Sequence, residues 1–134
     1  MQPRPTAAEL LATVAEVIER DIVPALEGPV QHHARVAASL VAIVERELRL
    51  GPAAAAAELG AIQRLLSGPD PTGGWSDPAL SATLPDARAR LAAALRDGLA
   101  DDPAMAREVW AALMEISRAD LSICKPGHDS WEGD

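Results

Sequence analysis

The sequence predicts an all-α fold, a single-domain bundle of about five helices. Three observations favour helices over strands. Hydrophobic residues make up 49% of the 134 positions, Phe and Tyr are absent, and most of the apolar residues are Ala and Leu. They recur at spacings of three and four, and no segment alternates Val, Ile or aromatic residues with polar ones, as a half-buried strand would. We assign the bundle to residues 1–127 and expect a disordered acidic tail at 128–134.

The first helix begins at a predicted capping box. The Thr6 hydroxyl can accept from the backbone of Glu9, and the Glu9 carboxylate can accept from the backbone of Thr6. Pro24 should end or kink this helix, and Gly28-Pro29 should complete the turn. The apolar stripe between these signals consists of Leu10, Leu11, Val14, Val17, Ile18 and Ile22.

The next two helices are expected to form an antiparallel hairpin. One runs from about Val30 to Leu50, and Gly51-Pro52 supplies its stop signal. The other starts at Pro52, which suits a first helical position, and continues to Leu66. Because almost nothing separates them, the helices should fold back on each other.

The second half of the chain should contain a long irregular segment and two helices. Ser67–Pro78 is dense in Gly and Pro and should lack regular structure, with Trp75 packed on the bundle. A fourth helix is expected over about Pro85–Leu99. The fifth should start at Asp102-Pro103 and end before Pro126-Gly127. Its wide apolar face, which includes Trp110, predicts that it is the most buried helix.

The helical periodicity also predicts which side chains form the core. Thirteen residues at core-facing positions should be nearly fully buried: Leu10, Val14, Ile18, Leu40, Ile43, Val44, Leu59, Ile62, Leu91, Leu95, Val109, Leu113 and Ile116.

Charge and cysteine content exclude several classes of function. The net charge is −8, from 20 acidic and 12 basic residues, and Lys125 is the one lysine in the sequence. Neutralising nucleic-acid phosphates requires clustered Lys and Arg, so we expect no nucleic-acid partner and no binding to an anionic membrane. There is no uncharged apolar run of membrane-spanning length and no signal-peptide pattern. Cys124 has no second cysteine to pair with, which fits a cytoplasmic location.

No motif for catalysis or for a cofactor emerges from the sequence. Adjacent residues on a helix point about 100° apart, so His32 and His33 cannot chelate one metal ion together, and we expect no metal site. Gly73-Gly74 is followed by Trp75 and not by the Lys-Ser/Thr of a phosphate loop. Cys124, near a helix C-terminus, is expected to serve packing. We therefore expect no catalytic residues, no cofactor, and a non-catalytic protein rather than an enzyme.

A polar ridge on the second helix is the most informative polar feature. His32, Arg35, Ser39 and Arg46 fall on one side of the helix, beside the apolar stripe. The ridge is either an ordinary solvated face or a set of arginines paired with carboxylates of the fold or of a partner. We expect Arg35 to be paired inside the fold and Arg46 to be exposed and available to a partner.

Four segments of the sequence resemble an uncharacterised bacterial family of small all-helical proteins. They are residues 4–11 (Arg-Pro-Thr-Ala-Ala-Glu-Leu-Leu), 24–28 (Pro-Ala-Leu-Glu-Gly), 33–48, and the closing segment 121–128. The resemblance implies a genomic setting beside acyl-CoA dehydrogenases and kinases similar to aminoglycoside phosphotransferases, and it brings no assigned activity. The chain departs from the family pattern at Ser39, Cys124 and His128.

The resemblance also suggests binding residues and a function. The family's polar positions fall here on His33, Arg35, Ser39, Glu45, Arg46 and Glu47, and the first five of these are our candidate binding residues. Our leading hypothesis is an accessory or interaction subunit that docks on the neighbouring kinase-like or dehydrogenase-like enzyme, with homo-oligomer formation left open. The alternative is a small module that binds an acyl or CoA-like ligand, with arginines holding phosphate.

Overall fold

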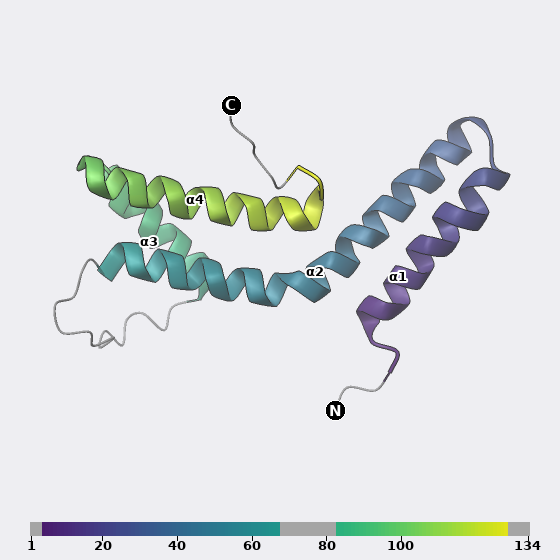
Figure 1. The fold of residues 1–134 in the computed structure, drawn as a ribbon, viewed down its shortest axis with the longest axis horizontal. Coiled ribbons are helices and arrows are strands. Elements are labelled where there is room, and N and C mark those ends of the chain that lie inside the picture. The colour runs from purple at the N-terminus through teal and green to yellow at the C-terminus, as the bar shows by residue number, and fades with distance from the viewer. Residues whose placement is uncertain (1–3, 68–82, 129–134) are drawn as a thin grey trace. The chain divides into compact units, whose positions relative to one another are not determined.

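The computed structural model describes residues 4–67 and 83–128. Within these ranges the chain forms four α-helices (Figure 1): α1 (Ala7–Val17), α2 (Gly28–Ser67), α3 (Leu84–Arg96) and α4 (Pro103–Cys124). A π-helical turn, η1 (Ile18–Ile22), and a 3-10 turn, η2 (Val23–Ala25), lie between α1 and α2. The described ranges contain no strand, so the all-α prediction is confirmed, while the described helices number four rather than about five.

The difference arises at Gly51-Pro52, where the expected end of a helix does not occur. Helix α2 is 40 residues long and continues through both Gly51 and Pro52. The predicted helix–helix hairpin at this point is therefore wrong. Pro52 has no N–H to donate to the Leu48 carbonyl, yet the fixed φ of proline is compatible with a helix. The alanines at 53–57, which have the highest helix propensity, allow the helix to resume at once. A local stop signal was therefore outweighed by the sequence on both sides of it.

Contacts divide the chain into two compact units, and the boundary lies at Pro52. The N-terminal unit comprises Met1–Pro52 and Leu121–Asp134, and the C-terminal unit comprises Ala53–Asp120. Helix α2 contributes residues to both units.

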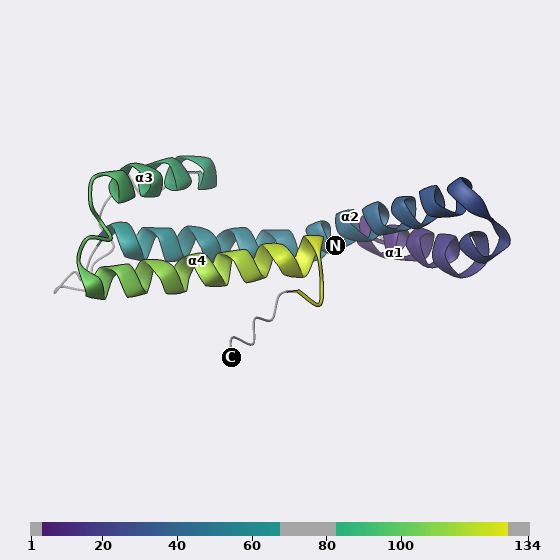
Figure 2. The ribbon, with the colours of Figure 1, turned by 90° about the horizontal axis from the view of Figure 1, so that it is seen from above.

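The N-terminal unit contains a helical hairpin, in which α1 lies beside the first part of α2 (Figures 1 and 2). The predicted capping box is confirmed: the Glu9 backbone donates to Thr6 Oγ1 at 3.2 Å, and the Thr6 backbone donates to Glu9 Oε2 at 2.7 Å. The helical path ends at Ala25, one residue after Pro24. Gln31 then holds the turn, because its Nε2 donates to the carbonyls of Val23 and Leu26 at 3.1 and 2.7 Å.

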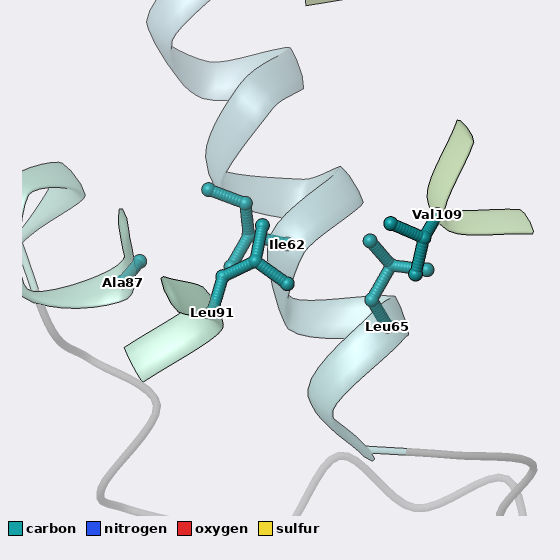
Figure 3. Packing of buried hydrophobic residues seen from close by; sticks show 5 residues of the cluster. All are labelled: Ile62, Leu65, Ala87, Leu91 and Val109. Atoms are coloured by element: carbon teal, nitrogen blue, oxygen red, sulfur yellow. The ribbon is translucent and has the colours of Figure 1, made fainter. Parts of the chain in front are cut away.

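The C-terminal unit has the larger apolar core (Figure 3). Ile62 and Leu65 from α2 meet Ala87 and Leu91 from α3 and Val109 from α4, and Ile62 is 1% exposed. Leucines and smaller residues of the same three helices and of the segment between α3 and α4 pack around this cluster: Leu59, Leu66, Leu84, Leu95, Leu99, Ala100, Met105 and Ala112.

The predicted core is confirmed at its centre and wrong at its edges. Ile62, Leu91 and Val109 are buried as expected. Five predicted core residues are between 38% and 57% exposed, namely Leu10, Val14, Leu40, Val44 and Leu113. The remaining five are partly buried, namely Ile18, Ile43, Leu59, Leu95 and Ile116. Helical periodicity identifies an apolar face, but it does not say whether another element covers that face.

Helix α4 is less buried than its sequence suggested. Trp110 is 68% exposed, and Cys124 is exposed rather than packed. Both expectations of burial were therefore wrong, because one face of α4 contacts the core and a second apolar face is open to solvent.

The start of α4 is capped as predicted. Asp102 Oδ2 accepts hydrogen bonds from the backbone N–H groups of Ala104 and Met105, both at 3.0 Å. These two donors have no partner within the helix, so the carboxylate satisfies them and also complements the positive end of the helix dipole.

We expect Asp102→Ala to lower the free energy of unfolding by about 1 kcal/mol, because it removes this cap. Urea denaturation of the purified protein measures the change. Asp102→Asn is the matched control, since an asparagine oxygen can still accept from the same N–H groups. Equal stability of the Ala variant and the wild type would show that the cap contributes nothing.

Several expectations concern residues outside the described ranges. They are the irregular structure of the Ser67–Pro78 segment beyond Ser67, the packing of Trp75, and the tail from residue 129 onward. Ser67 itself is the last residue of α2. In the part of the chain that the structure describes, no helix combines the length and the apolar character needed to cross a membrane.

Candidate functional site

The five binding residues suggested by the sequence all lie on the part of α2 in the N-terminal unit, and the two arginines differ from expectation. Arg46 is partly buried, and its Nε donates to the Ile123 carbonyl at 2.6 Å. This carbonyl belongs to the last turn of α4, where no further helical N–H is available to it, so Arg46 caps the C-terminus of that helix. Arg35 is exposed and makes no hydrogen bond or ion pair with any described residue. The expected roles of Arg35 and Arg46 were therefore reversed.

Glu45 is also engaged within the fold. Its side chain is 16% exposed, and its carboxylate accepts from Arg49 Nε at 2.8 Å. Both residues line an open cleft of about 640 Å³, together with Leu48 and the first residues of α1. The Thr6 and Glu9 backbone N–H groups at this end of α1 are taken by the capping box. The charged side chains of this cleft are thus already engaged in ion pairs or hydrogen bonds within the fold.

His33 and Ser39 are exposed and do not complete a site with the arginines. At about 100° per residue, His33 lies roughly 160° round the helix from Arg35. The rings of His32 and His33 are 6.2 Å apart and tilted. Among the residues that the structure describes, no three His, Cys, Asp or Glu side chains gather as metal ligands would. Arg35, Ser39 and Arg46 therefore share one side of α2, whereas His33 and Glu45 lie on other sides of the helix.

One charged pair was missed by the sequence analysis. Arg88 Nε and Nη2 donate to the two oxygens of Glu58 at 2.5 and 2.7 Å, and Glu58 is 8% exposed. This hydrogen bonding and the negative charge of Glu58 raise the pKa of the Arg88 guanidinium above its ordinary value, burial opposes the rise, and Asp120 adds to it. Thirty residues separate the partners, so no local spacing could have revealed the pair. It joins α2 to α3 and serves the fold.

An exposed row on α4 is the first of two apolar surfaces. We define the α4 row as Trp110, Leu113, Met114 and Ser117, which lie roughly 40–140° round α4 from Val109 and of which Met114 is partly buried. Trp110 is 68% exposed and Leu113 38% exposed. Arg107 and Arg118 are exposed beside the row. The row combines a large aromatic side chain with flanking positive charge.

The second apolar surface lies on the hairpin of the N-terminal unit. We define the hairpin face as eight Leu and Val residues that are each between 39% and 58% exposed: Leu10, Val14, Val17, Val30, Val36, Leu40, Val44 and Leu48. Monomeric proteins rarely expose a contiguous apolar patch of this size without a functional reason.

The fold and these surfaces define a class, a small all-helical protein with exposed apolar surfaces on both of its units. The chain belongs to the family described as a domain of unknown function (DUF6285), which it matches over residues 24–128. This match agrees with the expected membership of an uncharacterised family. No curated protein and no solved structure matches the chain.

Proposed function

We propose that the protein is a non-catalytic interaction subunit that docks onto an enzyme through the α4 row. The observation that carries this proposal is the exposure of Trp110, at 68% of its surface, on a helix whose other side already contacts the core.

Tryptophan and arginine suit such a role on physical grounds. A Trp side chain offers a large apolar area with few rotatable bonds, and Trp and Arg are the residues most enriched at energetic hot spots of interfaces. Leu113 extends the apolar area by one turn, while Arg107 and Arg118 are exposed on the edge. The complementary partner surface is an apolar pocket of indole size with carboxylates on its rim.

The resemblance noted in the sequence supplies the candidate partners. It places proteins of this kind beside acyl-CoA dehydrogenases and kinases similar to aminoglycoside phosphotransferases, and we propose that the partner is one of these two enzymes. We place the complex in the cytoplasm, since the exposed thiol of Cys124 suits a reducing compartment.

The alternative function, a module for an acyl or CoA-like ligand, would use Arg35 and Arg46 to hold phosphate. Arg46 donates to the Ile123 carbonyl, whereas Arg35 faces solvent. Two arginines with such different surroundings do not support a shared phosphate site, so the interaction subunit is the better-supported proposal.

The test measures binding of the purified protein to each of the two candidate enzymes by calorimetry. We expect one enzyme to bind, and Trp110→Ala to weaken that binding by about thirtyfold or more, the loss typical of a hot spot of 2 kcal/mol. The variant should fold normally because Trp110 is mostly in solvent.

Glu115→Ala is the matched control, because Glu115 is exposed on the opposite side of the same helix. It should bind as the wild type does. Absence of binding to both enzymes, or equal binding by the Trp110 variant, would contradict the proposal.

A further inference from the structure

The hairpin face is a second apolar surface, independent of the α4 row. Helices α1 and the first part of α2 run antiparallel in the hairpin (Figures 1 and 2). Ala15 on α1 and Ala38 on α2, which are 8% and 0% exposed, mark the buried sides of the two helices. Apart from Leu48, which lines the cleft beside the start of α1, the exposed leucines and valines therefore lie outside the contact between α1 and α2.

The two exposed rows lie on the same side of the hairpin. With about 100° per residue, Leu10, Val14 and Val17 lie roughly 100–160° round α1 from Ala15. By the same measure, the α2 members of the face other than Val36 lie roughly 80–160° round α2 from Ala38, in the same rotational sense. Because the helices are antiparallel, an equal rotational sense places both rows on one side. Together the two rows make up the hairpin face.

The N-terminal unit has little other apolar burial to stabilise it. Its buried hydrophobic residues within the described ranges are Ala15, Val23, Ala38 and Ile123, and two of these are alanines. The larger side chains of the hairpin are largely on the exposed face instead. A two-helix hairpin of this kind gains its core when a second pair of helices covers it, as in a four-helix bundle.

We infer that the hairpin face binds a second copy of this chain, so that two hairpins form a symmetric four-helix bundle. A fully exposed Val or Leu has about 160–200 Å² of surface, so the exposed fractions amount to roughly 700 Å² of each chain. Pairing two copies would bury about 1,400 Å², which falls within the range of about 1,200–2,000 Å² for specific, stable interfaces. A two-fold axis needs one self-complementary patch, and this face supplies it.

The charges on the face favour one orientation of the two hairpins. Asp21 and His33 lie at the turn end of the face, and Glu47 lies at the opposite end. With both turns at the same end, each Asp21 and each Glu47 would approach its own counterpart in the second copy. With the turns at opposite ends, His33 can donate to Glu47 of the second copy, and like charges are kept apart. The two-fold axis then passes near Val14 and Leu40.

The first experiment compares two glutamate substitutions at neighbouring exposed positions of α2. Light scattering after gel filtration should give the wild-type protein twice the mass of one chain at about 100 µM. Leu40→Glu places a charge on the hairpin face and should give the mass of one chain. Ser39→Glu adds the same charge on another side of the helix and should remain a dimer. A single-chain mass for the wild type, or a dimeric Leu40→Glu, would overturn the inference.

The second experiment does not depend on the folding of the glutamate variants. In a Cys124→Ser background, Leu40→Cys should form a disulfide between two chains under mild oxidation, while Ser39→Cys should not. Equal cross-linking of the two variants would contradict the proposed interface. The results of these two experiments do not depend on the result of the calorimetry with the Trp110 variant, because the α4 row belongs to the other unit.

Discussion

Replacing Ile62 by Ala will lower the free energy of unfolding by about 3–5 kcal/mol, the upper part of the range for truncating a buried Ile. Ile62 is 1% exposed and lies in the cluster with Leu65, Ala87, Leu91 and Val109 (Figure 3). The substitution removes three methyl or methylene groups from a site that three helices surround. Those helices cannot all move to fill the cavity, so both the transfer free energy and the packing contacts are lost. Urea denaturation followed by circular dichroism measures the change.

Leu113→Ala is the appropriate control for this prediction. Leu113 was expected from the sequence to be a core residue, but it is 38% exposed on the α4 row. Its truncation should cost about 1 kcal/mol, because much of the side chain is already in water. A loss of stability at Leu113 as large as that at Ile62 would mean that the described face of α4 is the wrong one.

Replacing Arg88 by Met will lower the free energy of unfolding by about 1–3 kcal/mol, because it leaves the Glu58 carboxylate buried without its partner. This loss is smaller than the about 3–5 kcal/mol for breaking a fully buried pair, since the Arg88 side chain is 54% exposed and water screens the interaction. The raised pKa of Arg88 means that its contribution is fully present below the pKa of an unfolded arginine and is lost only above it. Deprotonation of Arg88 should therefore not weaken the wild-type protein near neutral pH.

Two further variants separate the pair from a general effect of charge. Arg20→Met removes an exposed partner of Glu16, whose ion pair spans 2.7 Å, and should change stability by less than about 0.5 kcal/mol. The double variant of Glu58→Met and Arg88→Met should regain part of the stability lost by Arg88→Met, because no buried charge is left unpaired. A double variant less stable than Arg88→Met would show that the pair is not the cause.

Local features of the fold could be read from the sequence because their physical causes lie within a few residues. The capping box of Thr6 and Glu9 and the Asp102 cap each involve partners two or three positions apart. The helical periodicity likewise identified Ile62, Leu91 and Val109 as core residues. Helix class, helix starts and the centre of the core follow from such short-range chemistry.

The candidate site depended on partners that are distant along the chain. The sequence placed the polar ridge on α2 correctly, but the carbonyl that accepts from Arg46 lies 77 residues away and determines which arginine is engaged. Glu58 and Arg88 are 30 residues apart, and the sequence around each of them gives no indication that the other is its partner. No spacing rule reaches over such separations, so only the tertiary structure could assign these roles.

By itself, the sequence determined that this protein is helical, where most of its helices begin, and which faces of them are apolar. Only the tertiary structure decided that Leu40 and Trp110 face solvent. The physical reason is that an apolar face favours burial against any complementary surface. Whether that surface belongs to the same chain depends on the packing of distant segments, which local sequence does not encode.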